Sequence, residues 1–480
     1  MRTLAVLLCA LAAASVAGCS KRPAETPAEA YSPGWMRAGD GTPPNVLLIS
    51  IDTMRHDHTG WTGRWEKSFT PALDELATKS TRFDAATTPA TATRPAVASL
   101  FTGLYPGRHP ARTNSFRLGT ALPRISTSLA NAGYQSAGFT GNGLLDQKAG
   151  FLEGFATSEV FETYFGSLDS QIADAGIEWL AARDPSRPFF LWLHMMDPHG
   201  PYLSAPAEVQ DQVPFDDGLG GGELAPHDQN YGNGVIPRYQ VLRASKRAPF
   251  YRRRYRAEVH WADRQIGRVL AALERAGLDR STLVILTADH GESLGEHDAY
   301  FQHGWYVYEP SANVPLAFAL PGKIPAGQSL GGNASLVDVF PTLLAGLGLP
   351  TPAGLEGEDL GPLLRGIARE NPRGPVFVTA PKESRIVGVR DGRFKLIYTP
   401  APVAGARAER PFDPPGWQLF DLAADPGETR DVSAEHPAVT DRLKGAILEW
   451  MRAHNLENPA SSPKVDPATE ERLRQLGYIE

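Results

Sequence analysis

The stretch Thr87–Gly103, with the sequence TTPATATRPAVASLFTG, predicts a threonine at the start of a buried helix. Pro95 suits the first turn of a helix, where its missing N–H costs no hydrogen bond. The apolar residues that begin at Val97 continue the helix, and the glycine at position 103 is a typical stop. Thr93 is therefore expected to present its hydroxyl at a helix N-terminus.

Two other stretches carry acidic and imidazole side chains directly after short apolar runs. Val46–Ile51 and Leu283–Leu286 predict buried parallel strands, and Asp52 follows the first while Asp289 and His290 follow the second. In open α/β sheets, ligand groups gather beyond the carboxyl ends of the strands. We therefore expect these three side chains to meet the threonine hydroxyl and form a site that attacks a charged ester.

Strand-like and helix-like segments alternate along the chain. Strands are predicted at Tyr134–Thr140 and Phe189–His194, and helices at Ile125–Gly133 and Tyr255–Gly277. This alternation predicts an α/β fold with a mixed, mostly parallel central sheet flanked by helices. At 480 residues, the chain is long enough for one large domain and a smaller one.

The overall charge argues against a nucleic-acid partner. The formal net charge is −7 and the isoelectric point is near 6.0, whereas nucleic-acid binders usually present a basic surface. No second long apolar segment follows the N-terminus, so we expect no membrane-spanning helix in the mature protein.

The N-terminus has the order of an export signal: Arg2, the apolar stretch Leu4–Val16, and then small residues. The sequence VAGC that ends at Cys19 looks like a bacterial lipobox, which implies residues 1–19 as a lipoprotein signal and a lipid on Cys19. An ordinary signal peptide cut near Ala17 is the alternative. Residues 20–44 are rich in Ala, Pro, Ser and Gly and predict a flexible tether. The expected location is the bacterial cell envelope, at its periplasmic or outer-membrane face, with the lipid as the only membrane contact.

In combination, the motifs resemble the sulfatase branch of the alkaline phosphatase superfamily. In that family a nucleophile opens a Cys/Ser-x-Pro-x-Arg signature, which Ala-Ser-Leu-Leu-Thr-Gly follows. Pro95 and the sequence ASLFTG from Ala98 align Thr93 with the nucleophile and Val97 with the arginine. This chain therefore resembles a variant with threonine at the nucleophile position.

The resemblance covers most of the chain and implies two structural units. The first is an alkaline phosphatase-like catalytic domain over residues 45–345. The second is a smaller C-terminal α+β subdomain over residues 346–480, with an antiparallel sheet and a closing helix at Ala438–Ala453.

The resemblance also implies roles for several polar residues. The His-x-x-Asp-Pro-His loop that ends at His199 is similar to the family's leaving-group region, so His199 is expected to protonate the departing alcohol. His194 and Asp197 would support it. His303 would contact the anionic oxygens of the substrate. Arg94, next to the predicted nucleophile, and His194 are predicted substrate contacts.

The predicted cofactor is one divalent metal ion. Usual sulfatases hold calcium with an Asp-Asp pair, a further Asp and an Asn, whereas this chain has Thr53 for the second Asp and His290 for the Asn. A nitrogen ligand shifts the preference from calcium toward zinc or manganese. The predicted ligands Asp52, Thr93, Asp289 and His290 are similar to those of phosphoethanolamine transferases and nucleotide pyrophosphatase/phosphodiesterases. Because a threonine does not form formylglycine, the nucleophile must attack as an alkoxide.

The stretch Ser204–Phe250 lacks periodicity and is predicted to be a lid over the site. Four arginines follow it, at positions 252, 253, 254 and 256. They either attract an anionic substrate or simply open a solvated helix.

Three functions compete on these observations. The first is hydrolysis of sulfuric or phosphoric esters, with an anionic ester as substrate. The second is a phosphodiesterase or a phosphoethanolamine-type transferase, favoured by the threonine and by His290. The third is a non-catalytic binding lipoprotein of the envelope, favoured by the missing arginine and the missing formylglycine precursor.

Overall fold

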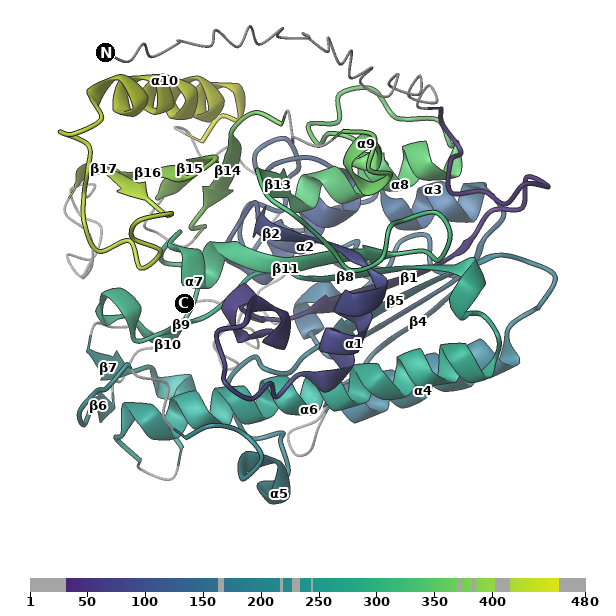
Figure 1. Cartoon of the computed structure of the whole chain (residues 1–480), viewed down its shortest axis with the longest axis horizontal. Helices are drawn as coiled ribbons and strands as arrows, with labels where there is room; N and C mark the ends of the chain where they lie inside the picture. The colour runs from purple at the N-terminus through teal and green to yellow at the C-terminus, as the bar shows by residue number, and fades with distance from the viewer. Residues whose placement is uncertain are drawn as a thin grey trace, which may run out of the picture.

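The core of the protein is a nine-stranded sheet in the order β12-β2-β11-β8-β1-β5-β3-β4, with β13 beside β2 (Figure 1). The computed structural model describes residues 32–162, 168–215, 219–226, 234–242, 245–368, 373–381, 386–401 and 415–456. The strands of the sheet are β1 (Asn45–Ile51), β2 (Thr81–Thr87), β3 (Gln135–Thr140), β4 (Thr157–Val160), β5 (Phe189–Met195), β8 (Thr282–Ala288), β11 (Asn313–Ala319), β12 (Gln328–Leu330) and β13 (Ala334–Ser335). Strand β11 is antiparallel to both of its neighbours, and the other pairings are parallel. The predicted α/β fold with a mostly parallel sheet is confirmed.

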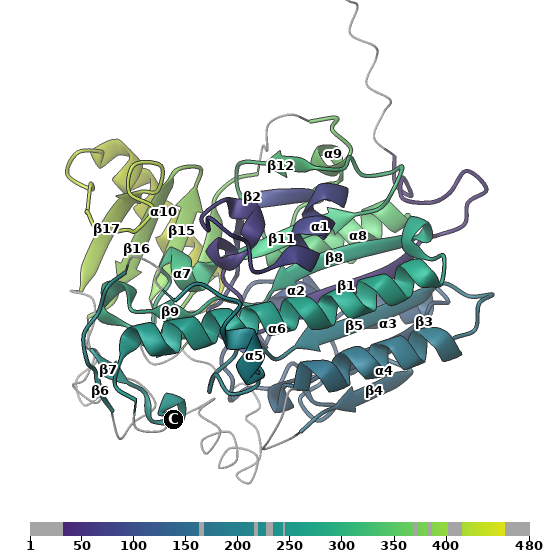
Figure 2. The ribbon, with the colours of Figure 1, turned by 60° about the horizontal axis from the view of Figure 1, so that its bottom comes forward.

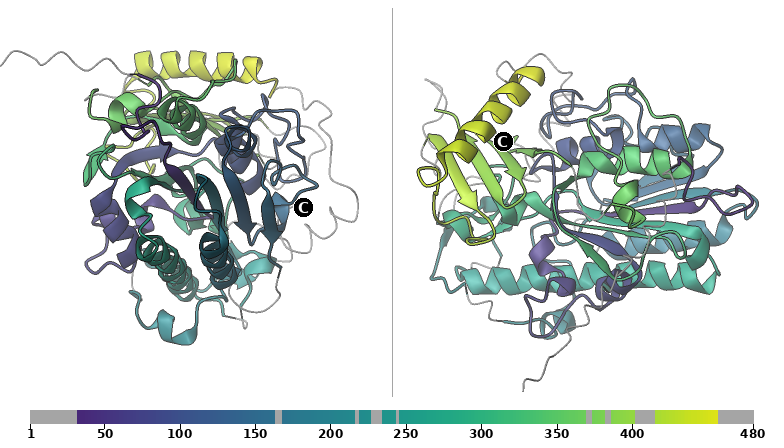
Figure 3. Two further views of the ribbon diagram at one scale, coloured as in Figure 1. Left: turned by 90° about the vertical axis from the view of Figure 1, so that its right-hand side faces the viewer. Right: turned by 45° about the horizontal axis from the view of Figure 1, so that its top comes forward.

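Helices cover both faces of this sheet (Figures 1 and 2). On one face lie α1 (Pro71–Lys79), α4 (Leu168–Ala182) and α6 (Ala248–Arg275), and on the other lie α2 (Thr93–Thr102), α3 (Ile125–Asn131) and α8 (Val339–Leu347). Figure 3 shows α4 and α6 side by side beneath the sheet. The long helix α6 forms because apolar residues recur every three or four positions along its buried face. It also caps α1, since Asp263 accepts hydrogen bonds from the N–H groups of Ala72 and Leu73.

The strand register brings distant polar residues to one edge of the sheet. Strand β1 lies between β5 and β8, and Ile51 is paired with Met195 on one side and with Ala288 on the other. All three strands are buried, as their apolar sequences predict. Since the strands are parallel, Asp52 and Asp289 emerge next to each other at their carboxyl ends.

A C-terminal subdomain lies beside this edge of the large domain, as predicted (Figure 1). It has an antiparallel sheet of β14 (Val376–Thr379), β15 (Val387–Asp391), β16 (Phe394–Thr399) and β17 (Gly416–Asp421), closed by α10 (Pro437–Ala453). The shorter elements are α5 (Ala207–Gln210), β6 (Ala225–Pro226), β7 (Val235–Ile236), β9 (Ser293–Leu294), β10 (Tyr300–Gln302), α7 (Glu309–Ala312) and α9 (Gly361–Leu364).

Buried ion pairs join the subdomain to α7 of the large domain. Lys395 of β16 is 1% exposed and lies 2.9 Å from carboxylate oxygens of both Glu309 and Glu428. Arg390 of β15 pairs with the other oxygen of Glu309 at 2.6 Å. Because Glu309 begins α7, these pairs fix that short helix in place.

The four arginines near the start of α6 bond to the segment that precedes the helix. Arg252 and Arg256 are buried, whereas Arg253 and Arg254 are partly exposed, as a solvated helix start predicts. Arg256 donates to the carbonyls of Pro214 and Phe215, and Arg254 donates to that of Tyr202. Arg252 bonds to the carbonyl of Gly220, and Arg253 pairs with an aspartate of the same segment at 2.9 Å. The described parts of the predicted lid are therefore tied to α6 by guanidinium groups.

The prediction of a flexible tether over residues 20–44 is wrong for its last part. Trp35 and Met36 are buried, and the N–H groups of Gly34 and Met36 donate to carbonyls of α8 at 2.7 and 2.9 Å. Arg37 also donates to the carbonyl of Leu347. The predicted signal peptide, Cys19 and the start of the predicted tether lie outside the described residues. Within the described part of the chain, no helix is both long and apolar enough to cross a bilayer.

Replacing Met36 with alanine tests whether this segment belongs to the core. We expect Met36→Ala to lower the free energy of unfolding by about 2–5 kcal/mol, because it leaves a cavity against α8. Chemical denaturation followed by tryptophan fluorescence measures this change, with Ser32→Ala, an exposed position, as the control. Equal stability of the two variants would mean that the segment is a tether.

Candidate active site

Three buried side chains from three neighbouring strands converge at the carboxyl edge of the sheet. Asp52 follows β1, Asp289 follows β8, and His194 lies near the end of β5. One ligand atom from each lies within 4.8 Å of the other two, and all three residues are buried. Within the part of the chain that the structure describes, these three side chains are close enough together to bind one metal ion.

Thr93 lies at this cluster, at the first residue of α2. Its Oγ1 is 3.5 Å from Nε2 of His290, and that Nε2 is 3.7 Å from Asp52 Oδ1 and 3.6 Å from Asp289 Oδ2. His290 Nδ1 is 3.0 Å from the carbonyl of Gly291. Because a carbonyl only accepts, Nδ1 carries the proton, and Nε2 turns its lone pair toward the threonine and the carboxylates. The structure thus brings Thr93, Asp52, Asp289 and His290 together, as we expected from the sequence.

His194 takes a different position from the predicted one. Its Nε2 is 3.5 Å from Asp52 Oδ2, and its Nδ1 is 2.8 Å from the hydroxyl of Ser50, which also accepts from the indole N–H of Trp192 at 3.0 Å. The structure therefore groups His194 with the two carboxylates rather than with the predicted substrate contacts. A ring oriented by a hydrogen bond at one nitrogen is the usual arrangement of a metal-binding histidine.

Asn142 is a member of the site that the sequence analysis missed. Its Nδ2 donates to Asp52 Oδ2 at 2.6 Å, and its Oδ1 accepts from the N–H of Leu144 at 2.9 Å. The signal was present, because Asn142 stands between two glycines just after the predicted strand Tyr134–Thr140, where an asparagine often caps a helical turn. That strand, β3, pairs with β5, which places its end at the same sheet edge.

The electrostatics of the cluster favour a bound cation. Burial opposes ionisation of Asp52, but the neighbouring imidazoles, His199 foremost, lower its pKa below the usual value. Burial and the Asp52 carboxylate together raise the pKa of Asp289 well above its usual range. Asp52 Oδ1, Asp289 Oδ2 and His194 Nε2 accept or donate no hydrogen bond within the described structure. Two buried carboxylates with uncommitted atoms beside an imidazole fit a divalent metal ion.

The two predicted catalytic histidines flank the cluster. The ring centroids of His199 and His303 are 5.2 Å apart, and those of His303 and His290 are 4.5 Å apart. Burial lowers the pKa of His199 to about 4, so its imidazole is neutral at pH 7. His199 Nδ1 is 2.7 Å from the carbonyl of Gly200, which fixes the proton on Nδ1. A role as an acid requires Nε2 to take up a proton when an anionic substrate binds.

Arg94 is already engaged in structural bonds. Its Nε and one terminal nitrogen donate to the carbonyls of Leu144 and Asn114 at 2.7 and 2.6 Å, and burial lowers its pKa to about 10. These bonds tie Arg94 to two loops that follow α2 in the sequence, and contact of Arg94 with substrate stays a prediction. Val97, in place of the family's arginine, is fully buried.

The loops that carry the site are held by the subdomain and by α7. The N–H of Thr91 donates to the carbonyl of Thr379 in β14, and the N–H of Gly291 donates to the carbonyl of Ser311 in α7. A Cβ at Gly291 would lie 2.0 Å from the carbonyl oxygen of Pro310, so only glycine allows this close approach. The helix and the loop that bear Thr93 and His290 therefore depend on the C-terminal half of the chain.

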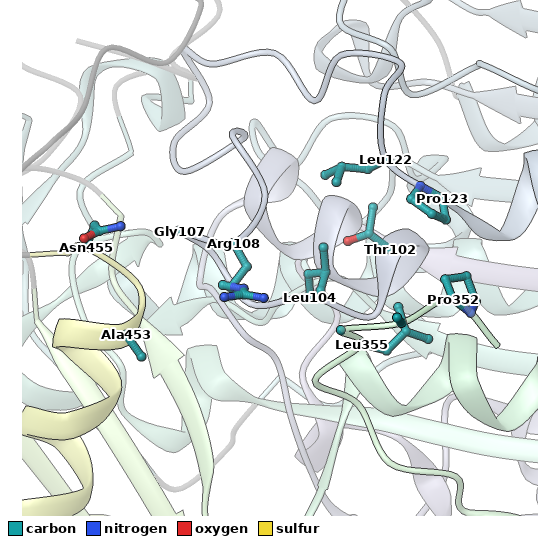
Figure 4. Close-up of a pocket in the computed structure, with 12 residues that line it drawn as sticks. Thr102, Leu104, Gly107, Arg108, Leu122, Pro123, Pro352, Leu355, Ala453 and Asn455 are labelled. Carbon is teal, nitrogen blue, oxygen red and sulfur yellow. The ribbon is translucent and has the colours of Figure 1, made fainter.

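The hollow shown in Figure 4 is separate from this cluster. It has a volume of about 390 Å³ and lies at Thr102, Arg108 and Asn455, between the end of α2 and the end of α10. Thr93 and Thr102 are the two ends of α2, about 14 Å apart at the rise of an α-helix.

An α/β sheet with a buried threonine at a helix N-terminus, and with carboxylates and imidazoles gathered at its carboxyl edge, is typical of a class of ester hydrolases, and comparisons with known proteins identify the family. The family model described as Sulfatase matches residues 44–349, and that described as N-sulphoglucosamine sulphohydrolase, C-terminal, matches residues 295–453. Choline-sulfatase of Rhizobium meliloti (strain 1021) is 27% identical over 470 residues, which cover 85% of this chain and 86% of that protein.

Two solved structures have the same fold. A protein in complex with its substrate D-glucosamine-2-N,6-O-disulfate superimposes with a TM-score of 0.73 at 21% identity, covering 87% of this chain and 99% of the other. The phosphonate monoester hydrolase of Agrobacterium radiobacter superimposes with a TM-score of 0.68 at 23% identity, covering 86% and 96%.

This chain therefore belongs to the sulfatase family, whose members are sulfuric ester hydrolases that use a divalent metal. The resemblance predicted from the sequence motifs is confirmed at the level of the family.

Proposed function

We propose that this protein hydrolyses sulfate monoesters with Thr93 as the nucleophile. The observation that carries the proposal is the placement of the Thr93 hydroxyl, 3.5 Å from an imidazole nitrogen that itself lies within 4 Å of two buried carboxylates. A hydroxyl at a helix N-terminus is also favoured for attack on an anion, because the helix dipole stabilises negative charge there.

Asp52, His194, Asp289 and His290 would hold one divalent metal ion beside the Thr93 hydroxyl. When bound, such an ion stabilises negative charge on an ester oxygen and on a threonine alkoxide. The two nitrogen donors favour zinc or manganese over calcium. The pKa of Asp289 is raised first by burial and then by the Asp52 carboxylate. An adjacent cation would favour the charged form of both carboxyl groups, which supports the proposal.

The chain's own residues would carry out a displacement in two steps. The Thr93 hydroxyl gives its proton to solvent, and its oxygen bonds to sulfur as the bond from sulfur to the alcohol oxygen breaks. The departing alcohol oxygen receives a proton from His199 Nε2, which takes up that proton from solvent when the anionic ester binds, while His303 faces the anionic oxygens. Water then attacks the sulfo-threonine, which releases hydrogen sulfate and restores the hydroxyl. Attack by threonine needs no formylglycine.

We also propose that the protein is exported and lipid-anchored. The support is the sequence alone: a positive start, an apolar core and the sequence VAGC that ends at Cys19.

Removal of the Thr93 hydroxyl tests the nucleophile. We expect Thr93→Ala to lower the rate on aryl sulfate esters by at least about 10³-fold, because the attacking oxygen is lost, while Thr93→Ser stays active. Thr102→Ala, at the other end of the same helix, controls for damage to α2. A Thr93→Ala variant as fast as the wild type would exclude Thr93 as nucleophile.

The same assay with matched aryl sulfates, phosphate monoesters and phosphodiesters separates the three functions. Faster cleavage of sulfates supports the proposal, and faster cleavage of phosphodiesters would point to the phosphodiesterase or transferase class. If no ester is cleaved when zinc, manganese and calcium are each supplied, the result would favour the third function, a non-catalytic binding lipoprotein.

Asn142 tests the metal ligands without an activity assay. Because it orients the Asp52 carboxylate, Asn142→Ala is expected to weaken zinc or manganese binding by about 10–100-fold. Titration calorimetry on the metal-free protein gives the dissociation constants. Asn45→Ala, at the opposite end of β1, is the matched control, and an equal affinity in both variants would contradict the proposed ligand set.

Cys19→Ala tests the lipid anchor. In a bacterial host that processes lipoproteins, the wild type is expected to incorporate labelled palmitate and to sediment with membranes. The variant should lose the label and appear in the soluble envelope fraction. Unchanged labelling would show that Cys19 is not the lipidated residue.

A further inference from the structure

Glu292 is a fully buried carboxyl group that the proposed displacement does not use. Its Oε1 lies 3.1 Å from Nδ1 of His303, and its Oε2 accepts a hydrogen bond from the hydroxyl of Tyr202 at 3.3 Å. Both oxygens of the carboxyl group are therefore engaged, and one of them meets a histidine that flanks the catalytic cluster.

The backbone on both sides of Glu292 is fixed as well. Its N–H donates to the carbonyl of Pro310 at 3.1 Å, and its own carbonyl accepts from the guanidinium of Arg55 at 3.1 Å. Arg55 is itself held by Asp57 and Glu296, each at 2.8 Å. A carboxyl group anchored on both sides in this way holds its partner in one orientation.

The orientation of His303 matters because its ring packs between two histidines of the site. Its centroid is 4.5 Å from that of His290 and 5.2 Å from that of His199. Nδ1 and Nε2 lie on different edges of an imidazole, so a ring held at Nδ1 by a carboxylate turns Nε2 the other way. A carboxylate at Nδ1 also selects the tautomer, as in catalytic triads.

Glu292 is not needed to explain the metal cluster. The candidate ligand group among the described residues contains Asp52, His194 and Asp289, and Glu292 does not belong to it. Its side-chain contacts are with His303 and Tyr202, and we therefore assign its role through the histidine.

We propose that Glu292 is a positioning residue that holds His303 by its Nδ1, with Tyr202 as its support, so that His303 Nε2 faces the anionic ester at Thr93. This inference rests on the proposed function, because the proposed function defines the ester as the substrate and Thr93 as the nucleophile. It predicts that Glu292 and His303 act as one unit.

A double-mutant cycle tests that unit. On aryl sulfate esters, we expect His303→Ala and Glu292→Ala each to lower kcat by about 10²-fold, and the double variant to be no slower than the single ones. Glu292→Gln keeps an acceptor oxygen for Nδ1–H and should recover about tenfold over Glu292→Ala. Tyr202→Phe should lower kcat by less than tenfold. Multiplied losses in the double variant would overturn the proposal.

Asp263→Asn is the matched control for the loss of a buried carboxyl group. Burial raises the pKa of both Asp263 and Glu292 to about 7, but Asp263 caps α1 and does not touch the site. We expect this variant to lose thermal stability and to keep kcat within twofold. A similar loss of kcat in Asp263→Asn and Glu292→Gln would assign Glu292 a general structural role.

A spectroscopic measurement keeps this test separate from the proposed function. Long-range ¹H–¹⁵N spectra of histidine-labelled protein, with the His303 signal assigned from His303→Ala, report which ring nitrogen carries the proton. We expect a protonated Nδ1 in the wild type and a mixture of tautomers in Glu292→Ala. An unchanged His303 signal would overturn the positioning role, whether or not the protein cleaves sulfate esters.

Discussion

Repulsion between two buried carboxylates is the constraint on which the site depends. Asp52 and Asp289 follow adjacent parallel strands, and an oxygen of one carboxyl group lies within 4.8 Å of an oxygen of the other. At an effective dielectric constant of about 20, two negative charges about 5 Å apart repel by about 3 kcal/mol. A divalent cation between them reverses the sign of that interaction. The same cation would stabilise the alkoxide of Thr93. The need to balance the two carboxylate charges therefore links the fold to the proposed chemistry.

The rest of the molecule keeps those charges and their partners in place. Ser50 and Trp192 orient His194, Asn142 orients Asp52, and the carbonyl of Gly291 orients His290. The C-terminal subdomain contributes through α7, whose first residue is paired with Lys395 and Arg390. A buried ion pair costs desolvation energy, and these pairs are best understood as fixing geometry rather than adding stability. The smaller subdomain is therefore part of the catalytic architecture even though the proposed nucleophile and ligands lie outside it.

The sequence predicted the sheet and most of the site because both follow from local rules. Apolar runs that end on Asp52 and Asp289 mark strand ends, and Pro95 with Gly103 marks a helix that begins near Thr93. Asn142 and the grouping of His194 with the carboxylates could not be predicted in this way, because they depend on which strands are neighbours. The role of Glu292 could not be predicted for a related reason. Its partner His303 follows only after a loop, so the contact between them depends on the path of that loop.

Other errors came from composition. Residues 20–44 look like a tether because they are rich in Ala, Pro, Ser and Gly, but Trp35 and Met36 within this stretch are buried, and its backbone bonds to α8. The arginines of α6 look like an anion-attracting surface, yet their guanidinium groups bond to loop carbonyls. Net charge or amino-acid content does not report the direction of a side chain, and in both cases that direction decides the role.

Anomalous X-ray diffraction from crystals grown with zinc or manganese tests the central claim most directly. The account predicts one anomalous peak at about 2.0–2.3 Å from oxygens of Asp52 and Asp289 and from imidazole nitrogens of His194 and His290, with the Thr93 hydroxyl beside it. An empty cluster at saturating metal, with Asp52 and Asp289 sharing a proton, would contradict it.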